Sequence, residues 1–412
     1  MYPKSELQRI RDLARQTAEY ARSDTMEERR QLWARHNSLR PGRPLFHVRF
    51  IPAREVIGSS EYQCTDPYLR ELEHGFLVNQ YRMKLVDDYI IEPFLTVRAS
   101  IKTSPEGIWG VPARLGEAPT NFGAAAFAPS LIEESDVQRL HVADYEIDET
   151  ETALRYEKLV EILGDILDVD VDRQGALCGI WYLDISTMLA RMRGLEQIMW
   201  DIYDRPQWLH QLLAFMRDNI LKHIDQTEAA GGFGMINHVN QAMPYSEELA
   251  PPKAGTHGVK PSEIWTFCAS QETTTFGAEH FDEFMLQYQI PIIERFGLSA
   301  YGCCEDLTHK IGLLRRTKNL RRIAVTPWAN TRRCAEQIGK DYIVSWRPNP
   351  SSAVAHGVDE SFIRKELREA FDIFDANGCV FDITLKDVET VSGDAGALIR
   401  WCKIVRDEIE RK

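Results

Sequence analysis

The chain of 412 residues is 44% hydrophobic and 27% charged, with a formal net charge of −13 at neutral pH. This size and hydrophobic content provide for a large core and exclude long disorder. The net negative charge disfavours nucleic acids and anionic membranes as partners, and no basic stripe interleaved with aromatic residues offsets it.

The start of the chain predicts a helical extension followed by the main domain. Apolar residues recur on one helical face within residues 1–43, which a Pro-Gly pair ends. Residues 44–412 form the main domain, with strands predicted over 45–51 and 94–98. The glycine- and proline-rich residues 102–145 are typical of a long loop or a small insertion.

From residue 151 onward, predicted helices and strands alternate. The continuous apolar run 177–182 predicts the third strand, and either 233–236 or 264–268 provides the fourth. The remaining predicted elements are helices over 151–167, 187–203, 206–229, 279–295, 307–316, 331–338, 359–376 and 394–410, and strands over 298–303, 321–326, 342–346 and 379–385. Asp204 is a candidate N-cap for the helix that begins at Pro206.

Repeated strand–helix units predict a parallel sheet. No glycine-rich dinucleotide motif or P-loop follows the first strand, so a closed (β/α)₈ TIM barrel is favoured over a doubly wound sheet. No run of about 18 apolar residues predicts a membrane span. The first residues lack the apolar stretch of a signal peptide, and the eight cysteines are scattered, so we expect a cytoplasmic protein.

The active site of such a barrel lies where the strands end on their carboxyl side. The predicted strand ends supply the following candidates: Arg49, Tyr182, Asp184, His238, Asn240, Gln271, Glu272, Tyr301, Trp328, Arg347, Asn349 and Lys386. Arginines there either clamp a substrate carboxylate or form salt bridges at the rim. Trp181, Trp265 and Trp346 join the aromatic residues that either line an apolar pocket or belong to the core.

The segment Tyr-Gly-Cys-Cys-Glu at residues 301–305 is the strongest local signal. Cys303 and Cys304 follow a predicted strand, and thiolates at such a place can bind a borderline metal such as zinc. Adjacent strand side chains point in opposite directions, so both cysteines reach one ion only if the backbone turns there. The alternative is one core cysteine and one pocket cysteine without a metal.

Four segments carry a family resemblance: residues 192–206, 270–284, 301–305 and 384–388 with the closing helix. They resemble the uroporphyrinogen decarboxylase superfamily, and the resemblance covers roughly residues 150–412. It implies a (β/α)₈ barrel and an enzyme.

Two branches of that superfamily compare differently with this chain. True decarboxylases carry Arg-Gln-Ala-Gly-Arg-Tyr after the first strand, whereas here residues 49–54 read Arg-Phe-Ile-Pro-Ala-Arg. Corrinoid-dependent methyltransferases hold zinc with a His-x-Cys after the fifth strand and a Cys after the eighth. Cys303 matches the first of these cysteines, but Tyr301 stands where His is expected, and no Cys follows the eighth strand. The chain looks closer to the methyltransferase branch.

The placement at strand ends, together with the family resemblance, gives expected roles to particular residues, Asp184 among them for the decarboxylase alternative. The expected zinc ligands are Cys303, Cys304, Glu305, His238 and Glu272. Catalytic roles are expected for Glu272, Tyr301 and Asp184. Substrate binding is expected from Arg49, Tyr182, His238, Trp328, Arg347, Asn349 and Lys386.

The leading functional hypothesis is therefore transfer of a methyl group from a small O- or N-methylated compound to a corrinoid carried by a partner protein, with zinc assisting. The alternative is decarboxylation of a small aromatic or pyrrole acid, with arginines binding carboxylates. A third hypothesis is a barrel retained as a binding subunit. A homodimer is a further possibility, because barrels often dimerise.

Overall fold

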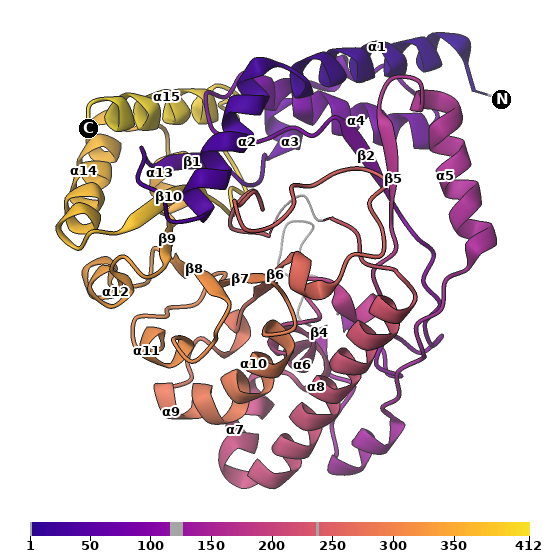
Figure 1. Ribbon diagram of the computed structural model, residues 1–412, viewed down its shortest axis with the longest axis vertical. Helices are drawn as coiled ribbons and strands as arrows, with labels where there is room; N and C mark the ends of the chain where they lie inside the picture. The colour runs from indigo at the N-terminus through magenta and orange to yellow at the C-terminus, as the bar shows by residue number, and fades with distance from the viewer. Residues whose placement is uncertain (1, 116–126, 236–238) are drawn as a thin grey trace.

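The computed structural model describes residues 2–115, 127–235 and 239–412, which form a mixed α/β architecture. Its strands are β1 (Leu45–Val48), β2 (Phe94–Arg98), β3 (Arg114–Leu115), β4 (Phe127–Ala128), β5 (Asp168–Asp172), β6 (Trp265–Cys268), β7 (Leu298–Tyr301), β8 (Leu320–Val325), β9 (Ile343–Trp346) and β10 (Val380–Leu385). The main sheet is parallel and has the order β1-β10-β9-β8-β7-β6. Figure 1 shows these six strands following an arc.

Two smaller sheets accompany the main one. β2 and β5 pair in parallel, and the short strands β3 and β4 form an antiparallel pair. Within the residues described, no strand pairing joins β1 to β2 or β5 to β6. The structure therefore shows a six-stranded curled sheet and a separate parallel pair, and the closed eight-stranded ring expected from the sequence is not shown.

The helices of the described residues are α1 (Lys4–Ala21), α2 (Asp24–Asn37), α3 (Ala53–Val56), α4 (Pro67–Met83), α5 (Glu149–Leu163), α6 (Ser186–Arg193), α7 (Leu195–Asp204), α8 (Pro206–Ala229), α9 (Ala278–Phe281), α10 (Gln287–Ile293), α11 (Ile311–Leu314), α12 (Thr331–Ile338), α13 (Pro350–Ala353), α14 (Glu360–Ala376) and α15 (Ala397–Glu410). Helices such as α11, α12 and α14 cover the convex side of the arc (Figure 1). A π-helix, Asp282–Leu286, joins α9 to α10. No helix in the described part of the chain is both long enough and apolar enough to cross a bilayer.

The third strand was predicted in the wrong place. Residues 177–182, expected as a strand, form part of a 3-10 helix, Ala176–Cys178, followed by turns. The strand is β5 instead, whose sequence Asp-Val-Asp-Val-Asp alternates between polar and apolar residues. A half-buried strand needs apolar side chains on one face only, so this alternation was the relevant signal and the continuous apolar run was not.

The structure also settles which run forms the fourth predicted strand and corrects two predicted helix boundaries. The fourth strand is β6, from the run 264–268, and Gly234 of the other run makes only an isolated antiparallel bridge to His257. The helix expected over 187–203 is broken at Gly194, whose φ of 84° leaves the helical region. Asp204 is not the N-cap of α8, since that position is Arg205 and no side chain caps it.

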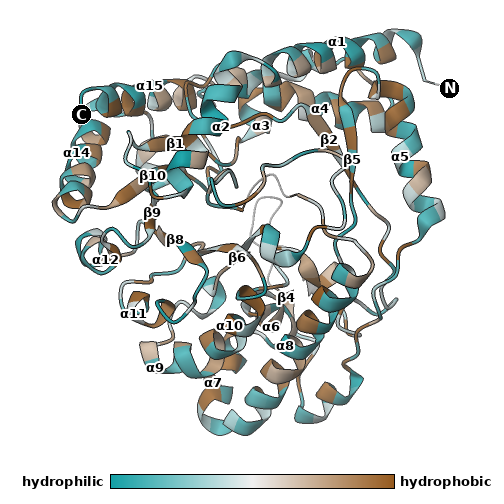
Figure 2. Ribbon diagram, in the orientation of Figure 1, coloured by the Kyte–Doolittle hydropathy of each residue, from teal (hydrophilic) through white to brown (hydrophobic). Residues whose placement is uncertain are grey.

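Alternate residues of the strands sort into two cores. Leu45, Phe267 and Ala300 pack on the concave side of the sheet, whereas Phe46 and Tyr301 pack on the convex side with the outer helices. Figure 2 shows the hydrophobic colouring concentrated in strands such as β2 and β6, while the helices carry both colours. By the same alternation, the residues that directly follow β1, β9 and β10 point to the concave side.

The segment 239–246, which is buried throughout, fills the concave side. Its Gln241 amide donates to the carbonyl oxygens of Tyr301 and Gly302, and the Thr384 hydroxyl donates to the Gln241 carbonyl. The segment thus spans from the end of β7 to β10. At the other end of the strands, the Asn37 amide donates to the carbonyls of Met243 and Tyr245, so the end of α2 anchors the same segment.

An ion pair without solvent exposure lies beside this anchor. Arg322 of β8 and Asp382 of β10 are fully buried, and their side chains lie 2.5 Å apart. His36 Nε2 lies 2.8 Å from the same Asp382 oxygen, and Arg322 also donates to the Asn37 side chain at 2.7 Å. Burial opposes ionisation of Asp382, but Arg322 and His36 hold its pKa below the usual value.

Candidate functional site

Three consecutive strands of the sheet end in a cation. Arg49 directly follows β1, Lys386 follows β10, and Arg347 follows β9. Lys386 and Arg347 are 5% and 3% exposed, although the protein as a whole is strongly negative. Because the carboxyl ends of parallel strands meet at one edge, these three residues lie along the mouth of the curled sheet, and we call them the cationic arc.

Cys303, just beyond β7, lies against this arc. The Lys386 ammonium donates to the Cys303 sulfur at 2.7 Å, and the Cys304 and Asn240 side chains lie 3.6 and 3.7 Å from that sulfur. Arg347 donates to the carbonyl of the preceding residue, Gly302, at 3.1 Å. Cys303 is 1% exposed, whereas Cys304 faces solvent.

This environment makes the two thiols differ. The hydrogen bond from Cys304 is the largest cause that lowers the pKa of Cys303, and the charges of Arg347 and Lys386 lower it further. Burial raises this pKa, but the net result is a value of about 6. The same hydrogen bond raises the pKa of Cys304. At neutral pH the buried Cys303 is therefore the thiolate and the exposed Cys304 is the thiol.

The backbone at Gly302 places both sulfurs on one side. Gly302 has a φ of 101°, and the chain turns there as soon as β7 ends. Glu305 fixes the turn, because one carboxylate oxygen accepts from the Cys303 amide at 2.7 Å and the other accepts from the Ser270 amide at 2.8 Å. Two neighbouring cysteines can lie on the same side only if the backbone turns, and the structure has this turn.

Replacing Gly302 by Ala is expected to destabilise the fold by about 1–3 kcal/mol, because the residue has a positive φ and little space. An added Cβ would lie 2.8 Å from Leu307 Cδ1 and 2.9 Å from Ala324 Cβ. Gly312→Ala is the matched control, since nothing lies within 4 Å of a Cβ there and the residue is helical. Urea unfolding of both variants checks the prediction, and equal stabilities would contradict it.

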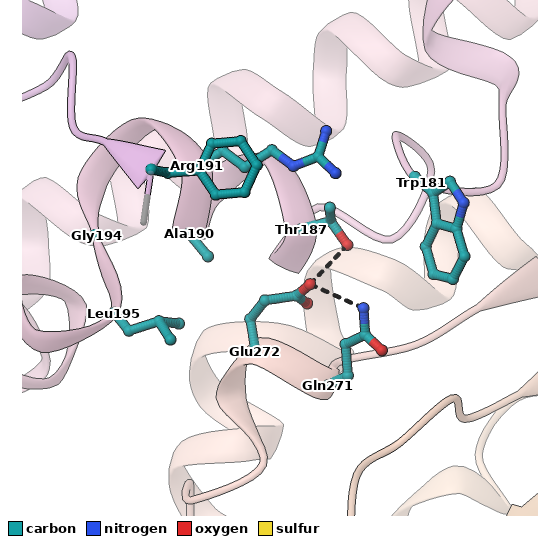
Figure 3. Close-up of a pocket in the computed structure, with 9 residues that line it drawn as sticks. Trp181, Thr187, Ala190, Arg191, Gly194, Leu195, Gln271 and Glu272 are labelled. Atoms are coloured by element: carbon teal, nitrogen blue, oxygen red, sulfur yellow. Dashed lines mark hydrogen bonds between the residues drawn. The ribbon is translucent and has the colours of Figure 1, made fainter. Parts of the chain in front are cut away.

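A pocket of about 540 Å³ opens beside the ends of α6 and β6 (Figure 3). Most of its lining is apolar, and its charged groups are Arg191 and Glu272. The lining residues are Phe127, Trp181, Thr187, Ala190, Arg191, Gly194, Leu195, Gln271 and Glu272. A pocket of this size and character suits a small aromatic molecule with one or two polar substituents.

A chain of hydrogen-bonding groups runs from the pocket wall into the core. The Thr187 hydroxyl lies 3.1 Å from a Glu272 oxygen and 2.7 Å from an Asp184 oxygen. Glu272 also accepts from Ser186 at 2.6 Å and from Gln271 at 3.0 Å. Figure 3 shows Glu272 between Thr187 and Gln271 on the pocket wall.

Asp184 is the buried end of this chain. It has no solvent exposure, and burial raises its pKa well above the usual value, with the Glu272 charge raising it further. Burial therefore favours the protonated form of Asp184. The neutral carboxyl can donate to Thr187, whose hydroxyl can in turn donate to Glu272.

The sequence-predicted site residues are only partly brought together. Cys303, Cys304, Arg347 and Lys386 form one cluster, and Asp184 and Glu272 form a second. Glu305 links the two through the Cys303 and Ser270 amides. His238 lies outside the described residues.

Other predicted residues lie elsewhere. The Tyr301 hydroxyl points to the outer layer and donates to Gln289 at 2.7 Å. Trp328 is 71% exposed, and Asn349 caps α13 by accepting from the Ser351 amide. Tyr182, which was assigned to the end of a strand, lies in the loop between β5 and α6.

The predicted zinc ligands do not fit a metal site as far as the structure describes them. No group of three or more His, Cys, Asp or Glu side chains among the described residues is arranged to hold an ion. Glu305 is occupied by backbone amides, Glu272 by hydroxyl and amide donors, and Lys386 lies on the Cys303 sulfur.

Thr187 and Arg191 were not among the residues predicted from the sequence. Both lie on α6, and they reach the pocket because they are one helical turn apart. The spacing of four residues was a visible signal, but nothing in it distinguished a pocket wall from an ordinary helix face. Trp181, predicted as either a pocket or a core residue, does line the pocket.

Comparison of the chain with known proteins gives no match to a family model and none to a curated protein. The site is therefore interpreted from its own geometry.

Proposed function

We propose that the protein removes a methyl group from a small O- or N-methylated aromatic compound and passes it to a corrinoid on a separate protein. One observation carries the proposal: a mostly apolar pocket has Glu272 on its wall, connected through Thr187 to the buried Asp184, whose raised pKa favours the protonated form. The proposal treats the parallel pair β2 and β5 as part of a barrel wall around the same mouth.

Proton supply is the chemical problem that this arrangement addresses. When the bond between methyl carbon and heteroatom breaks, its electron pair stays on the heteroatom, which is a poor leaving group unless it takes a proton. Asp184 holds that proton, Thr187 relays it, and Glu272 delivers it to the heteroatom in the pocket. The corrinoid supplies the electron pair that accepts the methyl group.

The remaining pocket residues orient the substrate. Trp181 and Leu195 offer apolar walls to an aromatic ring. The Arg191 guanidinium lies 4.8 Å from the centroid of the Phe127 ring, which holds it at the pocket where it can bind an acidic substituent of the substrate. A methoxylated benzoate combines these features.

The test is methyl transfer from methoxybenzoates to free cob(I)alamin, followed by the absorbance change of the cobalamin and by chromatography of the phenol product. We expect a methylated cobalamin and one equivalent of phenol, and no reaction with the corresponding benzoates that lack the methoxy group. Failure of all methoxylated and N-methylated donors would refute the proposal.

Decarboxylation is the second candidate, and the cationic arc favours it. Arg49, Arg347 and Lys386 at the ends of three neighbouring strands could bind a substrate with several carboxylates. The protein is therefore also incubated with aromatic and pyrrole acids, and these mixtures and the methyl-transfer mixtures are both analysed for carbon dioxide. Release of carbon dioxide without methyl transfer would select this candidate over the first.

A further inference from the structure

We propose that the mouth of the sheet carries a second reactive site. In this site Cys303 is a nucleophile that attacks a small electrophile, and Arg347 binds a carboxylate of that electrophile. This site uses no residue of the Glu272 pocket, so it does not depend on the proposed methyl transfer.

The first observation is the contact between Cys303 and Lys386. Their 2.7 Å separation lies in a buried environment, where an ammonium favours a thiolate strongly. The other groups that face the sulfur are Asn240, the Cys304 thiol and the charge of Arg347. Asp387, on the far side, lies 3.4 Å from the Cys304 sulfur and 3.5 Å from the Lys386 ammonium.

The second observation is that the buried Arg347 guanidinium has N–H groups without an acceptor in the described structure. Its Nη2 donates to the Gly302 carbonyl, yet Nε and Nη1 are buried and have no hydrogen-bond partner in the described structure. Buried N–H groups without acceptors are costly, and a guanidinium presents them in the geometry that a carboxylate matches. The residue before Cys303 accepts from the same guanidinium, which places the free N–H groups beside the nucleophile.

The third observation is access. Cys304 faces solvent, and its sulfur contacts the Cys303 sulfur at 3.6 Å. The Cys304 side chain thus lies between solvent and one side of the Cys303 sulfur, and its displacement would open a path to the thiolate. A small molecule can then place its carboxylate on Arg347 and its electrophilic carbon at Cys303.

The covalent step is a simple displacement. The Cys303 thiolate gives its electron pair to the electrophilic carbon, a carbon–sulfur bond forms, and the leaving group departs with the electron pair of the broken bond. With iodoacetate as the probe, the products are S-carboxymethyl-Cys303 and iodide, and no oxidant or reductant is required. Lys386 loses its anionic partner in this step, while Arg347 keeps the new carboxylate.

The experiment compares iodoacetate with its neutral analogue iodoacetamide on the full-length protein, with mass spectrometry identifying the modified cysteine. Relative to the same comparison on glutathione, Cys303 is expected to favour iodoacetate by about tenfold, the effect of one charged hydrogen-bonded contact. The iodoacetamide rate at Cys303 is expected to be half-maximal near pH 6, where the pKa of Cys303 lies.

Two variants make the result specific. Arg347→Gln is expected to remove the preference for iodoacetate but leave Cys303 reactive toward iodoacetamide, and Cys304→Ala is expected to keep the preference. The wild-type comparison needs no variant, so poor folding of Arg347→Gln would still leave the proposal testable. Glu272→Gln should not change the labelling, which distinguishes failure here from failure of the proposed methyl transfer.

Three results would overturn the proposal. The first is a ratio of the two rates at Cys303 equal to that of glutathione. The second is modification of Cys304 in preference to Cys303. The third is a protein that reacts only after treatment with a chelator and becomes protected again by added zinc, because Cys303 would then be a metal ligand.

Discussion

Glu272→Gln is expected to lower the rate of methyl transfer about 10²- to 10⁴-fold, the usual contribution of a general acid. Glutamine keeps the size of the side chain and its contacts with Ser186 and Gln271, but it cannot pass a proton from Thr187 to the substrate. Initial rates with a methoxybenzoate and free cob(I)alamin measure the effect. The dissociation constant of the substrate should change little, because the loss concerns a proton transfer.

The control is Glu279→Gln on the exposed side of α9, which removes the same charge outside the pocket. It should keep the full rate. Asp184→Asn tests the other end of the relay. Burial favours the neutral form of Asp184, so the amide replaces a proton donor without burying a new charge, and the fold should persist while the rate falls. A Glu272→Gln enzyme with unchanged activity would exclude the relay.

Asp382→Ala is expected to lower the free energy of unfolding by about 3–5 kcal/mol, because it leaves the Arg322 charge buried without a counter-ion. The loss is large beside the about 5–15 kcal/mol that stabilises a typical domain. His36 and Asn37 would also lose part of their network, so the anchor of α2 on the concave side should weaken. Urea unfolding followed by tryptophan fluorescence measures the change.

Two further variants separate the charge effect from packing. The double variant Arg322→Met and Asp382→Leu removes both charges and should recover much of the stability, since apolar pairs often replace buried ion pairs without loss. Glu151→Gln breaks an exposed pair with Arg155 in α5 and should cost no more than about 1 kcal/mol. Equal losses for Asp382→Ala and Glu151→Gln would refute the assignment of Asp382 as a buried counter-ion.

Some regular elements from residue 206 onward were predictable because local patterns specify them. Helix α8 begins and ends where the apolar stripe and Pro206 predicted, and α12 matches its predicted range. The third strand was missed because the run 177–182 is as apolar as a buried strand, although it is a turn-rich loop at the pocket. Composition over six residues cannot separate these two environments.

The candidate site was predictable only in outline. The rule that strands deliver functional residues at their carboxyl ends identified Cys303, Arg347 and Lys386 from the amino-acid sequence alone. Their mutual distances, the raised pKa of Asp184 and the contacts of Thr187 depend on residues that lie far apart in the chain. No spacing in the sequence encodes such contacts.

The sequence by itself determined a strand–helix alternation, a parallel sheet and a pair of cysteines at a strand end, because each follows from the local period of apolar residues and from short-range geometry. Only the tertiary structure decided that segment 239–246 fills the concave side, that Lys386 contacts Cys303, and that Glu272 faces a pocket. Those outcomes depend on burial and on contacts between distant strands. Such contacts shift a pKa, or give a polar group its hydrogen-bond partner, only once the chain has folded.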